Sequence, residues 1–266
     1  MKNTQLSVAD GIATLTLSRP ERKNALSNAM RIDIEEALAQ LRADDQVRAL
    51  VLTGAGGDFC SGGDLSSFGD GDKRADGMGR ERMRALHRAF SALADFDRPV
   101  IAAVDGVAYG AGFSLALAAD LVIASDRARF CLSFSRVGLV PDLGALYTLP
   151  RIVGMQRTRE LAYSAREVRA DEARELGIVL EVHKQEDLLP RAVQLAAALA
   201  AASPVAFSMT KQLLKSSFDL ERDTFLEAEA NAQAVAFTTE YLKEAAGRFM
   251  RREPARFQWP ARDADR

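Results

Sequence analysis

Two glycine-rich segments carry the clearest chemical signal in the sequence. The first is Phe59–Leu65, FCSGGDL, and the second is Gly106–Leu115, GVAYGAGFSL. Each follows an apolar run that predicts a buried strand, so each places small residues where a helix begins. Backbone N–H groups at such a turn are free to approach a ligand, and two of them on one oxygen form an oxyanion hole. Tight turns and close helix packing would require the same glycines.

The side chains suited to acid or base chemistry are few. Asp142 can transfer protons, although a Pro-Asp pair ahead of an apolar stretch is also typical of a helix N-cap. His87 lies on a predicted helix, where it either faces solvent or activates water. Ser114, Asp142 and His183 follow the chain order of an α/β-hydrolase triad, but Ala116 replaces the last glycine of the nucleophile turn. The residues alone leave these roles open.

The elements that would position these residues alternate between strands and helices. Asp10-Gly11 between two alternating runs predicts a hairpin. Ser27 predicts a helix cap. The apolar residues on one face of the helix that follows are Met30, Ile34, Leu38 and Leu41. Buried strands are predicted at 49–52, 100–104 and 121–124, and a mobile loop followed by a helix is predicted from residue 66 onward. The alternation predicts an α/β fold.

The end of the chain differs from the rest. From Pro204 onward the pattern is helical and offers more apolar surface than a short segment can bury by itself. We therefore expect a core at residues 1–203 and a helical oligomerisation region at residues 204–266, which packs on a neighbour or a partner subunit.

Composition restricts the partners and the compartment. The 35 basic and 37 acidic residues give a net charge of −2 without a block of like charges, which excludes a nucleic-acid footprint. Cys60 and Cys131 form no CxxC pair and predict neither a disulfide framework nor a zinc site. The most apolar stretch, 192–202, is shorter than the ~20 residues of a membrane span, and no signal segment is evident. We expect a cytoplasmic protein with a small-molecule partner, no membrane association and no metal.

Several segments together resemble the crotonase, or enoyl-CoA hydratase/isomerase, superfamily. They occur in that family's order over nearly the whole chain and include the two glycine-rich segments described above. The matching segments are RPERKNAL (19–26), FCSGGDL (59–65), RPVIAAVDGVAYGAGFSLALAAD (98–120), VGLVPDLGALYTLPRIVG (137–154) and FMRREPARF (249–257).

The resemblance implies a spiral of β-β-α units with a helical C-terminal trimerisation region, assembled as a homotrimer or a dimer of trimers. It implies a substrate that is an acyl-CoA thioester, with coenzyme A as part of the substrate and no separate cofactor. The implied oxyanion donors are the N–H groups of Ser61 and Ala111. The implied substrate-binding residues are Lys23 near the phosphates, Ser61, Asp64 and Leu65 near the adenine, together with Ala25 and Phe134.

The resemblance also predicts which reaction this chain performs. Family hydratases use two glutamates, and the matching positions here are Ser114 and Phe134. Asp142 remains, which resembles the aspartate of phenylacetate-pathway and dienoyl-CoA isomerases. One carboxylate suffices for isomerisation through a thioester enolate, so we predict an isomerase that shifts a double bond or opens a strained ring in an acyl-CoA, with Asp142 as acid and base. The alternatives are an enoyl-CoA hydratase, an acyl-CoA dehalogenase or hydrolase in which His87 acts with Asp142, and an inactive CoA-binding homologue.

Overall fold

The first two strands form the hairpin that Asp10-Gly11 predicts. In the computed structural model, which describes residues 1–68 and 77–261, β1 (Thr4–Ala9) pairs antiparallel with β2 (Ile12–Leu17). Asp10 and Gly11 have φ values of 50° and 76°, the left-handed conformations that a two-residue hairpin turn needs. The hairpin prediction is confirmed.

The main sheet continues from this hairpin as a set of parallel strands. β3 (Ala49–Gly54), β4 (Val100–Val104), β6 (Leu121–Ser125) and β9 (Glu181–His183) extend it in the order β1-β2-β3-β4-β6-β9. β3 and β4 are the buried strands that the apolar runs predict, because both faces of a parallel sheet are covered.

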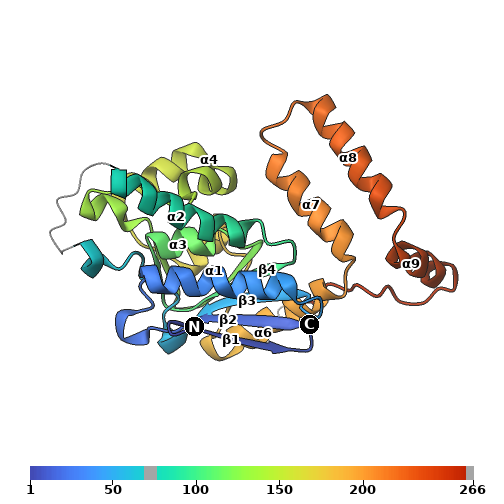
Figure 1. Cartoon of the computed structure of the whole chain (residues 1–266), viewed down its shortest axis with the longest axis horizontal. Coiled ribbons are helices and arrows are strands. Elements are labelled where there is room, and N and C mark those ends of the chain that lie inside the picture. Colours follow the sequence, from blue (N-terminus) through green and yellow to red (C-terminus); the bar gives the residue numbers. More distant parts are fainter. Residues whose placement is uncertain (69–76, 262–266) are drawn as a thin grey trace.

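Helices cover both faces of this sheet. α1 (Asn28–Ala43) and α2 (Gly77–Ala94) lie on one face, and α6 (Gln185–Ala200) packs on the other (Figure 1). The Ser27 side chain accepts a hydrogen bond from Met30 N at 3.2 Å, which confirms the predicted cap. The four predicted apolar residues of α1 are all buried. The core therefore has two apolar layers separated by the sheet.

A second, smaller sheet lies beside the carboxyl ends of β3 and β4. It consists of β5 (Val107–Tyr109), β7 (Arg129–Cys131) and β8 (Val168–Arg169), in that order. α3 (Ala111–Ala116) follows β5 almost directly. From β4 to β7 the strands alternate between the two sheets, and each pair is followed by a helical segment, which agrees with the predicted α/β spiral of β-β-α units.

The remaining core elements are short turns and two helices. α4 (Ala145–Ser164) is interrupted at Gly154, and α5 (Ala170–Glu175) follows β8. The 3₁₀ turns are η1 (Pro20–Arg22), η2 (Ala55–Gly57), η3 (Leu65–Phe68) and η4 (Ser133–Val137). The loop predicted at 66–79 begins in η3 and ends in α2, and its residues 69–76 lie outside the described residues.

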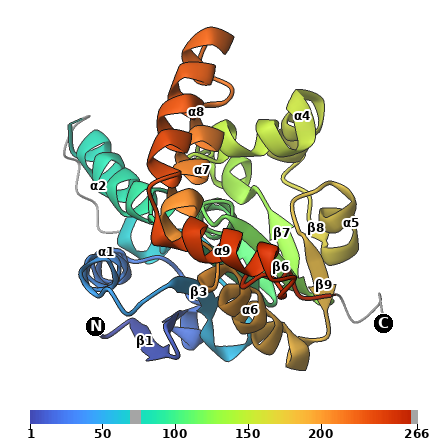
Figure 2. The same ribbon diagram turned by 90° about the vertical axis from the view of Figure 1, so that its right-hand side faces the viewer.

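Three helices at the end of the chain extend away from the layered core. They are α7 (Pro204–Ser216), α8 (Arg222–Ala236) and α9 (Glu240–Met250), and none of their residues is buried. Figures 1 and 2 both show α8 projecting beyond the rest of the molecule. No single helix of the described residues has the length and apolarity to cross a membrane. Within the part of the chain that the structure describes, the bent pair α6 and α7, at 106°, passes the length and apolarity test when its two helices are taken together.

Candidate active site

Successive residues of the turn after β3 donate backbone hydrogen bonds to two different neighbouring segments. Cys60 N–H donates to the Val107 carbonyl at 2.9 Å, so Cys60 pairs with β5. Ser61 N–H points to the other side and donates to the Lys23 carbonyl, also at 2.9 Å. A donor already engaged in this way is not available to a substrate oxygen. The structure therefore disagrees with the prediction that Ser61 supplies an oxyanion N–H.

Gly63, two residues later, has an N–H group that is not engaged in this way. Leu26 N–H donates to Gly62 O at 2.7 Å, and Asp64 N–H donates to Leu26 O at 3.1 Å. In such a parallel bridge, the residue between the two bonded positions points its N–H away from the paired segment. The N–H of Gly63 therefore faces away from Leu26, toward β5 and α3. Within the described chain, Gly63 N–H has no hydrogen-bond acceptor. A Cβ at Gly63 would meet no atom within 4 Å, so the surroundings are open.

The second N–H belongs to the first residue of α3. The cap of this helix is Gly110, which has a φ of 50° and no side-chain hydrogen bond. Ala111 N–H therefore lacks an acceptor in the described part of the chain, as the first N–H groups of a helix commonly do. The helix dipole adds partial positive charge at this end.

Close backbone packing brings the two segments together. Gly62 has a φ of 105°, and a Cβ there would lie 2.8 Å from the Tyr109 carbonyl oxygen and 3.7 Å from Ala111 N. A Cβ at Gly112 would collide with the Cys60 carbonyl oxygen. Only glycine permits both approaches, which explains the glycines at these two positions. The two free N–H groups thus lie on neighbouring segments in direct contact.

Asp142 has one carboxylate oxygen without a partner in the described part of the chain. Its Oδ1 is buried and has no hydrogen-bond partner among the residues that the structure describes. Burial raises the pKa of Asp142 to about 6, although the nearby positive form of His87 lowers it. The cap of α4 is Gly144, with no side-chain hydrogen bond. The alternative that Asp142 serves as a helix N-cap is therefore wrong.

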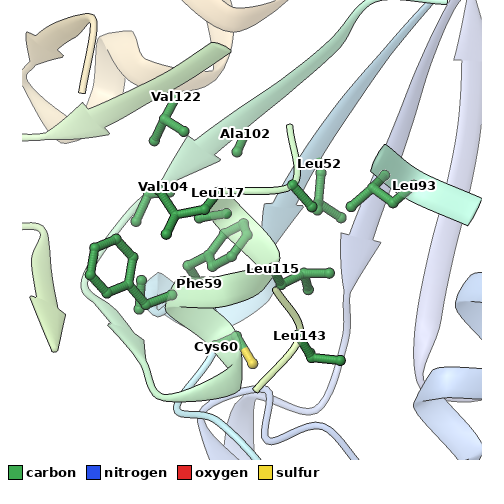
Figure 3. Close-up of a cluster of buried hydrophobic side chains, with 14 of the residues drawn as sticks. Leu52, Phe59, Cys60, Leu93, Ala102, Val104, Leu115, Leu117, Val122 and Leu143 are labelled. Atoms are coloured by element: carbon green, nitrogen blue, oxygen red, sulfur yellow. The ribbon is translucent and has the colours of Figure 1, made fainter. Parts of the chain in front are cut away.

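The backbone that follows Asp142 is held in an unusual conformation. Leu143 has a φ of 48°, which costs a residue with a branched side chain of this size on the order of 1 kcal/mol. Its side chain is buried beside Leu115 and Cys60 in the main core (Figure 3), and this packing stabilises the conformation. A Cβ at Gly144 would lie 2.9 Å from the ring of Phe90 on α2. The turn thus fixes Asp142 between the core and α2, the helix that also carries His87.

A small apolar cavity connects the elements that carry these groups. Leu26, Leu115 and Leu143 line it together with Leu86 and Phe90 of α2. Each of the first three is a chain neighbour of a predicted site residue, respectively Ala25, Ser114 and Asp142. The segments that sequence analysis singled out therefore surround one space.

The two positions that lack glutamates are both filled. Ser114 is fully buried, and its hydroxyl donates to the Gly110 carbonyl at 3.3 Å within α3. Phe134, in η4, is buried with its ring 3.8 Å from a Cβ placed on Gly110. Neither side chain presents an ionisable group to the cavity. The structure thus offers no replacement for the missing acid or base at either position.

The residues predicted to bind coenzyme A lie on both sides of the turn after β3. Lys23 is exposed, with its Nζ 3.6 Å from Asp58 Oδ2. Ala25 is buried, and its carbonyl accepts a hydrogen bond from Arg19 at 2.9 Å. Lys23 therefore presents an exposed, ion-paired side chain, whereas Ala25 contributes backbone.

The other two predicted coenzyme A contacts differ in kind. Asp64 pairs with Arg19 at 3.0 Å and accepts bonds from the backbone N–H and hydroxyl of Ser66. The hydrogen bond from the Ser66 side chain, followed by that from Arg19, lowers the pKa of Asp64. Leu65 is 54% exposed, a large fraction for leucine in a folded protein. Asp64 orders the loop, and Leu65 offers apolar surface.

The hydrolase-like triad does not assemble. His183 lies in β9, and its Nε2 is 2.8 Å from Glu181 Oε2. Ser114 bonds within its own helix, as described above. Within residues 1–68 and 77–261, Ser114, Asp142 and His183 make no hydrogen bond to one another.

Comparison with known proteins agrees with this geometry. The family model described as enoyl-CoA hydratase/isomerase matches residues 7–260. The 1,2-epoxyphenylacetyl-CoA isomerase of Escherichia coli is 38% identical over 251 residues, covering 94% of this chain and 96% of that protein. The short-chain-enoyl-CoA hydratase of Clostridium acetobutylicum is 31% identical over 252 residues, covering 94% and 95% respectively.

The solved structure of an enoyl-CoA hydratase/isomerase from Cupriavidus metallidurans superposes with a TM-score of 0.95. It is 40% identical in sequence, and the match covers 99% of both chains. The sequence segments, the spiral of β-β-α units and these similarities agree. The chain belongs to the enoyl-CoA hydratase/isomerase family, within the crotonase superfamily.

Proposed function

We propose that this protein is an enoyl-CoA isomerase in which Asp142 moves a proton along the acyl chain. The observation that carries the proposal is the buried, unpartnered Oδ1 of Asp142, with a pKa raised to about 6, beside the apolar cavity. A base with a pKa near the working pH transfers protons most effectively in both directions. A carboxylate engaged in a cap or an ion pair would not have this property.

The proposed reaction proceeds through a dienolate. In a 3-enoyl thioester, ionised Asp142 removes a proton from C2, and the electron pair delocalises onto the thioester oxygen and C4. The N–H groups of Gly63 and Ala111 donate hydrogen bonds to that oxygen, in place of the Ser61 donor predicted from the sequence. Protonated Asp142 then returns the proton to C4, which leaves the conjugated 2-enoyl thioester.

Coenzyme A would bind along the turn after β3. Lys23 supplies a positive charge for its phosphates, and exposed Leu65 offers apolar surface to the adenine ring. Phe134 would pack behind the reacting carbons, and Ala25 and Asp64 would maintain the loop. No further cofactor enters the proposed reaction.

The assembly and the compartment are also proposals. The unburied helices α7–α9 expose Phe218, Phe249 and Met250 by 70%, 80% and 81%. Apolar side chains exposed to this degree favour a partner surface, so we propose that residues 204–266 build a homotrimer or a dimer of trimers. Cys60 and Cys131 are both buried and free, which favours the cytoplasm.

A second candidate function is nucleophilic displacement on an aromatic acyl-CoA. It is supported by His87, an exposed residue of α2 whose positive form lowers the pKa of Asp142. In this reaction Asp142 would attack the ring carbon that bears a leaving group, and His87 would activate water to hydrolyse the resulting ester. Release of halide from 4-chlorobenzoyl-CoA would support this candidate over the isomerase.

The test is the ultraviolet absorbance of the conjugated enoyl thioester over time. Wild type should produce absorbance from 3-enoyl-CoA, and Asp142→Asn should lose that activity by about 10² to 10⁴-fold. A fall in absorbance from 2-enoyl-CoA in both proteins would instead favour a hydratase with another acid or base. Coenzyme A binding without turnover of any substrate would favour an inactive homologue.

A further inference from the structure

The helices α7–α9 form an arm whose two ends both lie on α6. The arm leaves the core where α6 ends at Ala200, and α7 begins at Pro204. After α9 the chain turns back, and it returns to the side of the core that carries α6 and β9 (Figures 1 and 2). We call the returning segment, residues 251–261, the tail. The arm is therefore a loop closed on one helix, not a free extension.

Arg191 of α6 holds the returning tail. Its Nη2 donates to the Pro260 carbonyl at 3.2 Å, and its Nη1 donates to the Ala261 carbonyl at 3.0 Å. Among the described residues, these are the hydrogen bonds that join residues 257–261 to the core. The tail contains no helix or strand in its described residues, so no regular backbone pairing holds it in place. The position of the tail therefore depends on Arg191.

The guanidinium that holds the tail belongs to a buried ion pair. Arg191 Nε and Nη2 donate to the two carboxylate oxygens of Glu181 in β9, at 2.8 and 2.9 Å. The two side chains are 5% and 3% exposed. Two parallel bonds of this kind match the planar guanidinium to the carboxylate and fix its orientation. Arg191 is therefore a rigid anchor, unlike a flexible side chain on the surface.

Charge balance alone does not explain an arginine at position 191. A lysine ammonium would also neutralise Glu181, but all its donors lie on a single nitrogen. The guanidinium spreads its donors over three nitrogens, and Nη1 also donates to Gln194 Oε1 at 2.7 Å. The donors that a lysine cannot reproduce are those that reach the tail carbonyls.

Anchoring the tail restricts where the arm can lie. A segment held at both ends samples fewer positions than a segment held at one end. Phe249 and Met250, which are 80% and 81% exposed, end α9 directly before the tail. A surface that is already in position binds a partner without the entropy cost of ordering it.

We propose that Arg191 is a clasp for the tail, and that this clasp holds α9 in place for contact with a second copy of the chain. The part that concerns α9 rests on the proposed assembly, whereas the clasp itself does not. Opening the clasp would expose the Glu181 pair to water and give the arm a free end.

The single tryptophan of the chain, Trp259, reports the state of the tail. It is next to Pro260 and is 44% exposed, so acrylamide quenching and the emission maximum of its fluorescence measure whether the tail is docked. Arg191→Lys keeps a charge for Glu181 but cannot reach the carboxylate and both tail carbonyls together. Its quenching should rise, and its emission should shift to longer wavelength, toward the values of free tryptophan.

Two further variants separate the clasp from general damage to the fold. Arg42→Lys makes the same exchange at a guanidinium that donates to two backbone carbonyls at the end of α2, and it should leave the fluorescence unchanged. If Arg191→Lys fails to fold, Pro260→Gly makes the tail harder to order without altering the core, and it should raise the quenching as well.

The assembly is measured separately, by sedimentation over a range of protein concentrations. Arg191→Lys should dissociate at a higher concentration than wild type. The fluorescence comparison is repeated in proteins that also carry Phe249→Glu and Met250→Glu, so that loss of a partner surface cannot itself account for a change at Trp259.

Equal quenching in wild type and in Arg191→Lys would overturn the clasp. A released tail with an unchanged dissociation concentration would overturn its part in assembly. A wild type that is monomeric at every concentration would refute the proposed assembly, and a rise in quenching in Arg191→Lys would then still support the clasp.

Discussion

Asp142 has a feature that a structural carboxylate avoids: its Oδ1 is buried and has no hydrogen-bond partner among the described residues. Burial raises the pKa of Asp142 because a charge in a poorly solvated site is costly. The same cost makes it a stronger base than an exposed aspartate. Asp142 should therefore lower the stability of the fold while it raises the rate of the reaction.

The stability effect of Asp142 depends on pH. Its pKa is about 6 in the folded protein, against 3.8 for an ordinary aspartate, so the folded state binds the proton more tightly. The ionised carboxylate therefore destabilises the fold increasingly as pH rises from about 4 to 6, and fully above that range. We expect Asp142→Asn to raise the unfolding free energy by about 1 kcal/mol at pH 7.5, a value discounted for partial exposure, with a smaller gain at pH 5. Urea unfolding at both pH values measures this, and a pH-independent difference would contradict it.

The rate effect should follow the same titration. If ionised Asp142 is the base, kcat/KM falls about tenfold per pH unit below pH 6. The positive form of His87 lowers the pKa of Asp142, so His87→Gln should move this acid limb to higher pH. Arg88→Gln, an exchange of the exposed neighbour on α2, is the control. An unmoved limb in His87→Gln would show that His87 does not act on the base.

At the scale of elements, the site depends on contact between the turn after β3 and α3. Side chains are nearly excluded from this contact, and the backbone atoms of Cys60 lie against Gly112. Any added atom must move one segment relative to the other. Since the two proposed donors lie on different segments, their alignment is sensitive to this spacing.

Gly112→Ala tests that dependence. The new Cβ would collide with the Cys60 carbonyl, so α3 must shift away from the turn. We expect kcat/KM to fall by about 10² to 10³-fold, the usual cost of one misplaced oxyanion donor. Unfolding should be easier by about 1–3 kcal/mol. Gly79→Ala on α2, where a Cβ meets nothing within 4 Å, is the matched control. Unchanged activity in Gly112→Ala would argue against the two-donor arrangement.

The sequence predicts the elements well but misplaces one donor. The hairpin at Asp10-Gly11, the Ser27 cap and the buried strands depend on local patterns, and all are confirmed. The choice between Ser61 and Gly63 depends on which side of the turn each N–H faces. That choice is set by bonds to Lys23 and Leu26, more than thirty residues away, and by the left-handed φ of Gly62. No local pattern encodes those partners.

The acid and base residues show a similar limit. Asp142 is evident from the motif, but its role depends on whether it caps α4, and only the three-dimensional structure assigns the cap to Gly144.

At the scale of the whole molecule, α7–α9 extend from the core (Figure 1) and expose several large apolar side chains, among them Phe218, Phe249 and Met250. These helices and their connections contact the core through ion pairs, for example Lys211 with Asp120 at 2.9 Å and Arg151 with Asp219 at 3.1 Å. These contacts orient the helices without covering their apolar side chains. The surface that remains is consistent with assembly between identical copies.

The assembly proposal gives a direct prediction. Analytical ultracentrifugation of the wild type should give three or six times the 28.9 kDa chain mass. Replacing Phe249 and Met250 by glutamate should shift the mass toward the monomer, since a charge is costly in an apolar interface. Lys243→Glu, an exposed charged position on the same helix, should leave the mass unchanged. A monomeric wild type, or a double variant with unaltered mass, would contradict the proposal.

The two proposed donors are main-chain amides of Gly63 and Ala111, and this has a consequence for how such a protein can diversify. Apart from exchange to proline, no side-chain substitution deletes a backbone N–H, so activation of the thioester is inherited wherever the glycines that bring the two segments together are kept. Positions 114, 134 and 142 can then change independently and alter which proton moves, without rebuilding the means of stabilising the enolate. A fold organised in this way separates the shared first step of a reaction from the step that gives each enzyme its product.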